Sequence, residues 1–283
     1  MTAPFRPSLT STFLPNNSVN CFCYSGRVQI CLALFTNLLG CVGMGALFEN
    51  FGLWLQKMQD KFIKDFIVDD RWRYITDGLE ATLIITFCAV MLGILIGFVV
   101  ATIRTTHDNT GKLRLLNALC RLYTTVIRGI PMIVQLMIIV LLIFGPMGWP
   151  EIPSAIIAFG INSGAYVSEI VRGGIMSIDR GQMEAGRSLG FNYLQTMVLI
   201  VFPQAFKNVL PALANEFIVL LKETSVAGYI GIHELTKGGD IIRGRTFDAF
   251  FPLIIVALIY LVMVIVLEKL VARLERRLRQ SEH

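Results

Sequence analysis

Three polar residues stand at helical spacing inside an otherwise apolar stretch in the middle of the chain. Asn162, Tyr166 and Glu169 are separated by four and three positions, which puts them on one face of a helix, and Ser163 lies beside them. A carboxylate on such a face can bind an ammonium group, and the amide and hydroxyl groups can orient a ligand by hydrogen bonding. Polar groups inside membrane-spanning segments are costly, so this face is a candidate for a polar cavity.

Gln135 is a further candidate for the same cavity. It follows residues 129–131, a Gly-Ile-Pro sequence in which the missing proline N–H should kink a helix or unwind one turn. A broken helix leaves backbone groups that a ligand can use. Glu169 has a second interpretation, because it could instead pair with Arg128 or Arg172 and hold helices together. The sequence leaves both interpretations of Glu169 open.

The other reactive residue types form no catalytic or metal-binding pattern. The three histidines, His107, His233 and His283, are far apart, and the six cysteines include no C-x-x-C pair. The chain also has no Gly-x-x-x-x-Gly-Lys-Ser/Thr phosphate loop. We therefore expect neither an enzyme nor a nucleotide-driven motor, and no metal or cofactor.

The composition is that of an integral membrane protein. Apolar residues make up 54% of the chain and charged residues 16%, against roughly a quarter charged in an average soluble domain. The net charge of +5 is spread over the connecting segments. This distribution fits the excess of Lys and Arg in cytoplasmic loops better than nucleic-acid binding. We therefore predict an all-α protein that crosses the cell membrane several times.

Apolar runs of suitable length predict six spans, over residues 28–48, 78–103, 123–144, 152–171, 204–221 and 249–267. Residues 1–27 read as a flexible tail, 49–78 as an amphipathic surface helix, and 222–248 as a polar loop. The predicted domains are the tail 1–27, an extra span with its surface segment 28–74, a core 75–270 and a basic tail 271–283. Loop charges place both termini in the cytoplasm.

A polar segment, residues 184–203, lies between apolar runs and can form a short helix. Glu184, Arg187 and Ser188 would share one helical face. Gly190 should end the helix, because glycine readily adopts the left-handed conformation of a helix terminus. Such a polar helix between two spans needs a partner, so we interpret it as a docking helix.

The spacing of this segment resembles a motif of the permease subunits of binding-protein-dependent ABC importers, which is E-A-A, three residues, G, nine residues, I, one residue, L-P. The matching residues are Glu184, Ala185, Gly190, Ile200 and Pro203, while Gly186 and Phe202 replace an alanine and the leucine. Residues 128–135, 162–174 and 222–225 resemble the polar amino acid branch of this family, which carries histidine, glutamine, glutamate or arginine. The resemblance covers residues 75–270.

The resemblance implies a five-helix type I importer core with one additional N-terminal span. It also implies a transmembrane pair, formed with a second copy or a related permease subunit, that sits in the lipid bilayer on a dimer of ABC ATPase subunits. An extracytoplasmic amino acid-binding protein would supply the substrate. The residues that would couple to the ATPase are Glu184, Ala185, Gly186, Arg187, Ser188, Leu189 and Gly190. Glu184 at the helix start would also suit the positive end of the helix dipole.

A different class of protein, an ion-coupled secondary amino acid transporter, is the alternative. Such a transporter would be expected to carry paired acidic residues at the middle of the membrane and internal repeats. The sequence offers one candidate acid, Glu169, and no convincing repeat. We therefore favour the ATP-driven importer, with residues 184–190 as its coupling helix.

Overall fold

The computed structural model describes residues 44–280, and every regular element in this range is a helix. The predicted all-α fold is thus confirmed. The chain forms two compact units, Met1–Met58 and Gln59–His283. Of the first unit the structure describes the beginning of α2 (Met44–Phe62). The predicted first span, residues 28–48, lies mostly outside the described residues.

The second unit holds the predicted core and is built from one long series of helices. Short π-helical and 3-10 turns precede α3 and connect several of the later helices. The α-helices are α3 (Trp72–Thr110), α4 (Arg114–Gly129), α5 (Met132–Leu136), α6 (Glu151–Met176), α7 (Arg180–Ser188), α8 (Tyr193–Thr196), α9 (Phe202–Glu223), α10 (Leu235–Thr246) and α11 (Phe250–Gln280).

Four helices of the described part are long and apolar enough to cross a membrane, and one bent pair brings the number to five. The four are α3, α6, Tyr193–Ile230 and Phe250–Leu278. The bent pair is Arg114–Gly129 with Met132–Met147, whose axes differ by 111°. This sharp bend lies at the predicted Gly-Ile-Pro break. All five correspond in order to the second to sixth predicted spans.

α3 and α6 pack closely because each presents two glycines four positions apart. A Cβ atom at Gly93 would lie 2.8 Å from the Ser163 side chain, and one at Gly97 would lie 2.5 Å from Val167. On α6, Gly160 and Gly164 approach α3 in the same way. Small residues at this spacing let helices come together and gain van der Waals contact, which is the main source of helix association in a bilayer.

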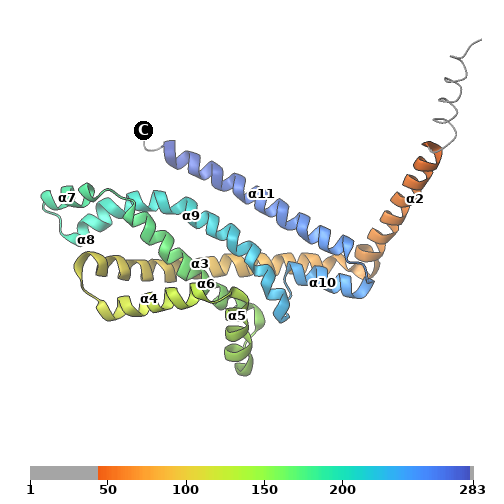
Figure 1. Cartoon of the computed structure of the whole chain (residues 1–283), viewed down its shortest axis with the longest axis horizontal. Helices are drawn as coiled ribbons and strands as arrows, with labels where there is room; N and C mark the ends of the chain where they lie inside the picture. The colour runs from red at the N-terminus through yellow and green to blue at the C-terminus, as the bar shows by residue number, and fades with distance from the viewer. Residues whose placement is uncertain (1–43, 281–283) are drawn as a thin grey trace, which may run out of the picture. The chain divides into compact units, whose positions relative to one another are not determined.

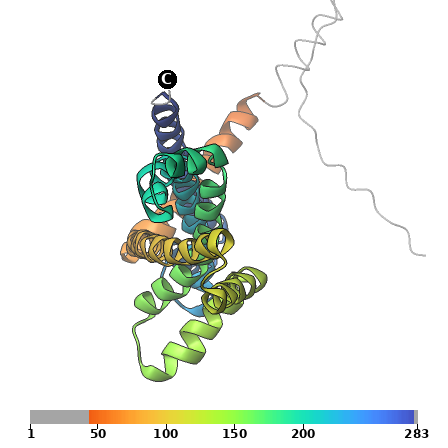
Figure 2. The same ribbon diagram turned by 90° about the vertical axis from the view of Figure 1, so that its left-hand side faces the viewer.

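The two ends of this unit carry different elements (Figure 1). α7 and α8 lie at the end where α3 finishes, and the Asn109 amide donates to the Tyr193 hydroxyl at 3.2 Å. Seen from that end, α7 and α8 lie together in front of the bundle (Figure 2). α10 lies at the other end, where the Leu235 amide donates to Thr82 of α3 at 3.1 Å.

The segment predicted as a polar loop, residues 222–248, is largely helical. The helix of α9 continues through a 3-10 segment, Thr224–Ile230, and α10 follows after a short turn. Buried Glu234 caps α10, since its carboxylate accepts hydrogen bonds from the amides of Thr236 and Lys237 at 2.7 Å each. Lys237-Gly-Gly resembles a loop in sequence, but this capping and the packing of α10 on α3 stabilise a helix.

Candidate functional site

α7 is the helical part of the polar segment, and it begins at Arg180. Asp179 caps it by accepting a hydrogen bond from the Gly181 amide at 2.6 Å. The prediction that Glu184 lies at the helix start is therefore wrong, because Glu184 lies more than one turn inside the helix. The carboxylate that suits the positive end of the helix dipole is that of Asp179.

Gly190 ends α7, as predicted from its position. Its φ of +87° lies in the left-handed region, where glycine has no Cβ to clash with the backbone. The Phe191 amide donates to the Gly186 carbonyl at 3.1 Å, and the Gly190 amide donates to the Arg187 carbonyl at 3.0 Å. These two bonds form a Schellman motif, which satisfies the last carbonyls of the helix and turns the chain.

One face of α7 packs on the chain itself and the rest is open. Gly186 is buried, and a Cβ there would lie 2.6 Å from the Thr196 side chain and 3.0 Å from Ile200. Glycine in place of the alanine of the family motif thus allows close contact with the following helix. The remaining residues of 184–190 are exposed, and Leu189 is 74% exposed although it is apolar.

The return from α7 to the bundle is a single long helix. Asn192 and Gln195 form a reciprocal capping box at its start, with both hydrogen bonds between 2.8 and 2.9 Å. The helix that contains the predicted fifth span starts at Tyr193, ten residues before Pro203, where we predicted that the span itself begins. A π-helical turn over Met197–Val201 precedes Pro203 within it.

The predicted polar face of α6 contacts three neighbouring elements. Asn162 and Ser163 are buried; the Asn162 amide donates to Gln135 Oε1 at 3.2 Å, and the Ser163 hydroxyl donates to Glu216 of α9 at 3.1 Å. One turn further on, Tyr166 is 38% exposed, and the Arg128 guanidinium lies 5.4 Å from its ring centre. The structure thus brings Gln135 and Asn162 together and gives Ser163 a partner that the sequence did not indicate.

Glu169 lies among arginines from three helices. Arg104 of α3 donates a hydrogen bond to it, the Arg172 Nε lies 3.4 Å away, and the Arg128 Nη1 lies 3.9 Å away. A cavity of about 370 Å³ is lined here by Arg104, Arg121, Thr124, Thr125, Arg128 and Glu169. The ion pairing considered for Glu169 is present, and it borders a strongly polar cavity.

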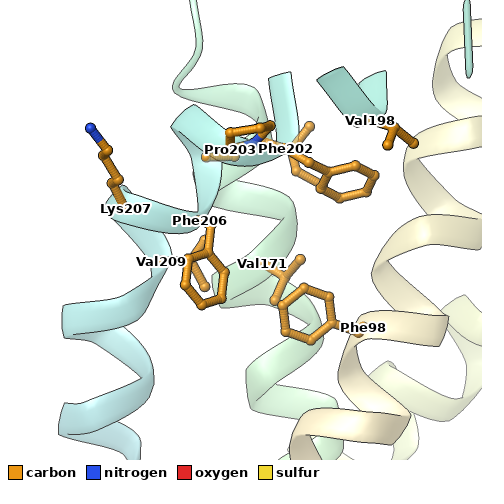
Figure 3. Close-up of a pocket in the computed structure, with 10 residues that line it drawn as sticks. Phe98, Val171, Val198, Phe202, Pro203, Phe206, Lys207 and Val209 are labelled. Carbon is orange, nitrogen blue, oxygen red and sulfur yellow. The ribbon is translucent and has the colours of Figure 1, made fainter. Parts of the chain in front are cut away.

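A larger cavity, of about 520 Å³, lies between α3, α6 and α9 and has a different character (Figure 3). Apart from Lys207, its lining side chains are apolar. Figure 3 shows Phe98, Phe202 and Phe206 grouped around it, while the amino group of Lys207 points away from them. A polar solute would find few hydrogen-bond partners there, so the arginine-lined cavity is the better candidate for a polar ligand.

Comparison with known proteins identifies the family. A model for binding-protein-dependent transport system inner membrane components matches residues 89–280, well over half of the chain. The chain belongs to this family. The resemblance seen in the sequence is therefore confirmed, and this permease is a multi-pass component of the inner membrane.

Curated relatives of the permease match most of its length. The arginine transport system permease protein ArtQ of Bacillus subtilis is 35% identical over 211 residues, which cover 74% of this chain and 94% of ArtQ. A putative glutamine transport system permease protein GlnP of Rickettsia bellii is 34% identical, over 72% of this chain and 93% of GlnP. The L-cystine transport system permease protein TcyB of Bacillus subtilis is 35% identical, over 76% and 90%.

Solved structures agree with the fold. A crystal structure of an amino acid ABC transporter with histidines superposes with a TM-score of 0.67 at 42% identity, and the match covers 72% of this chain and 94% of that one. Inward-facing structures of the MetNI methionine ABC transporter give a TM-score of 0.65 at 20% identity, over 74% and 98%. At this low identity, the similarity to MetNI supports only the fold of the permease.

Proposed function

We propose that this permease is the transmembrane subunit of an ATP-driven importer that moves a polar amino acid from an extracytoplasmic binding protein into the cytoplasm. The names of the three relatives specify transport of arginine, glutamine or cystine, which supports a polar amino acid as the substrate class. The lack of a phosphate loop in the sequence supports hydrolysis of ATP on a separate ATPase subunit.

The observation that carries the proposal is the state of α7. Its ends are fixed by the Asp179 cap and the Schellman motif, and one face is packed through Gly186, yet the other residues of 184–190 are exposed. A rigid helix with an exposed polar and apolar surface is suited to receive a moving partner and to pass the displacement on to the spans. We therefore assign residues 184–190 to contact with the ATPase.

The arginine-lined cavity supports the second part of the proposal. It offers a carboxylate, Glu169, beside the guanidinium groups of Arg104 and Arg128. A zwitterionic amino acid has an ammonium group that can pair with the Glu169 carboxylate and a carboxylate that can pair with the guanidinium groups. We assign Tyr166 and Glu169 to direct contact with the substrate, and the buried residues Gln135, Asn162 and Ser163 to the layer that supports the wall of the pathway.

The proposed assembly contains two permease subunits, either two copies or this chain with a related one, and a pair of ATPase subunits on the cytoplasmic side. α7 and the connection between α3 and α4 lie at the same end of the bundle, as the proposed orientation requires. This orientation has both termini of the chain in the cytoplasm, and the end that carries α10 faces the binding protein.

The docking role of α7 is tested with Glu184→Lys in membranes that contain the cognate ATPase subunit. Reversing an exposed charge at the contact should reduce copurification of the ATPase at least several-fold, because like charges across an interface are costly. Glu80→Lys is the matched control, since Glu80 is also exposed but lies near the start of α3. Equal copurification of both variants would contradict the assignment.

The energy source is tested by uptake into proteoliposomes. Uptake should require the ATPase subunits and ATP, and the purified permease alone should hydrolyse no ATP. Uptake driven by a proton or sodium gradient without the ATPase would instead favour an ion-coupled transporter.

A further inference from the structure

The bend between α4 and α5 leaves backbone carbonyls, among them that of Ile127, without their helical partners. In a continuous helix the amide of residue 131 would donate to the Ile127 carbonyl four residues earlier. Residue 131 is a proline, which has no N–H, and the two helix axes differ here by 111°. In a membrane, an unpaired carbonyl of this kind is strongly unfavourable, so it needs another donor.

Gln135 supplies that donor from the next turn of the chain. Its Nε2 atom lies 2.6 Å from the Ile127 carbonyl oxygen and 2.7 Å from the Ile130 carbonyl oxygen. A glutamine amide carries two N–H donors, so both are engaged by the broken backbone. Gln135 is also only 4% exposed. Its amide group therefore closes the break instead of lining an open surface.

Asn162 ties this closed break to α6. Its Nδ2 atom donates to Gln135 Oε1 at 3.2 Å, and Asn162 is 3% exposed. The two amide side chains thus connect the end of α4, the start of α5 and the middle of α6.

Arg128 lies directly beside this connection. Arg128 is the next residue after Ile127, whose carbonyl Gln135 binds, and its guanidinium reaches Tyr166 and Glu169. Tyr166 and Glu169 stand one and two turns beyond Asn162 on the same face of α6. The amide pair, together with the Tyr123 hydroxyl of α4, which donates to the Ile161 carbonyl of α6 at 2.5 Å, therefore holds a cation on α4 near its two partners on α6.

We propose that Gln135 and Asn162 are positioning residues that hold the bend and thereby place Arg128 at the Tyr166–Glu169 side of the polar cavity, without contacting the substrate. This inference rests on the proposed function for its transport readout. It also has a structural readout that requires neither substrate nor ATPase.

The transport test uses Gln135→Leu and Gln135→Glu in the complete transporter. Leucine removes both donors, and we expect turnover to fall roughly tenfold or more, because small displacements of a binding group are expensive. A glutamic acid side chain can donate an O–H to one of the carbonyls only while protonated. Relative to the unaltered transporter at each pH, Gln135→Glu should therefore be impaired at alkaline pH and recover partly at acidic pH.

Gln56→Glu is the matched control, because Gln56 is exposed and far along the chain from the bend. Its relative turnover should be independent of pH. A Gln135→Glu variant with a flat relative profile, or a Gln135→Leu variant that keeps its turnover but changes which amino acid is transported, would overturn the positioning role.

The structural test measures the geometry of the bend in the purified full chain. Spin labels are attached at Leu122→Cys on α4 and Met176→Cys on α6, which are 60% and 67% exposed, in a background without native cysteines. Gln135→Leu should broaden or shift the distance distribution between the labels, and Gln135→Glu should approach the original distribution at acidic pH. An unchanged distance distribution in both variants refutes the positioning role even if transport fails for another reason.

Discussion

At the scale of single residues, Glu169 shows which contacts helical spacing can predict and which it cannot. Its pairing with Arg128 or Arg172 was one of two predicted roles, and both guanidinium groups are near it. Helical spacing did not point to Arg104, which lies 65 positions away and reaches Glu169 from another helix. Spacing along one helix shows which residues share a face, but it does not show which helix that face meets.

Glu234 provides a prediction at the same scale. Burial disfavours its charged form and raises the pKa of this carboxyl above its usual value of 4.5, although backbone amides and Tyr260 donate hydrogen bonds to it. The folded state therefore binds a proton more tightly than the unfolded state. The stability contributed by Glu234 is fully present below pH 4.5 and decreases as the pH rises through the raised folded pKa.

Glu234→Gln should remove this part of the pH dependence. The measurement is the thermal unfolding midpoint of the detergent-purified chain at a series of acidic to neutral pH values. Glu80→Gln, at an exposed position, should keep the original slope. If Glu234→Gln and the unaltered chain lose stability in parallel as the pH rises, Glu234 does not titrate in this way.

At the scale of elements, Gly190 and Gly173 allow the effect of backbone strain to be measured separately from that of side-chain crowding. A Cβ atom would meet nothing within 4 Å at either Gly190 or Gly173, but Gly190 has a φ of +87° and Gly173 lies in the regular helix α6. Gly190→Ala should cost about 1–2 kcal/mol in the left-handed conformation. Gly173→Ala should be neutral or stabilising, because alanine favours a helix.

The two alanine variants are compared by thermal unfolding and by copurification with the ATPase. Gly190→Ala should weaken both, since the end of α7 would fray, while Gly173→Ala should weaken neither. Equal behaviour of the two variants would show that the left-handed turn is not needed to present α7.

The sequence predicted the elements better than their ends. Apolar length was enough to locate the five spans of the described part, and Gly190 correctly marked the end of α7. The start of α7 and that of the long helix at Tyr193 were missed, because Glu184 and Pro203 looked like boundaries while the caps were Asp179 and Asn192. α10 was missed because its stability comes from tertiary packing and a buried cap.

At the scale of the whole molecule, the proposed orientation can be tested at two exposed residues. Leu189, on the α7 side, is 74% exposed, and Tyr229, at the other end of the long helix, is 81% exposed. In intact cells a membrane-impermeant thiol reagent should label Tyr229→Cys and leave Leu189→Cys unlabelled. Permeabilised cells should give labelling of both. Labelling of Leu189→Cys from outside would reverse the orientation.

The length of the helix Tyr193–Ile230 has a mechanical consequence. Its 38 residues span about 57 Å at the usual rise per residue, and α7 is joined directly to one end. If this rod pivots near its middle, a push of about 5 Å at α7 tilts it by roughly 10° and swings its far end by a similar distance in the opposite direction. In the proposed orientation, such a pivot would convert a displacement on one side of the membrane into the opposite displacement on the other side.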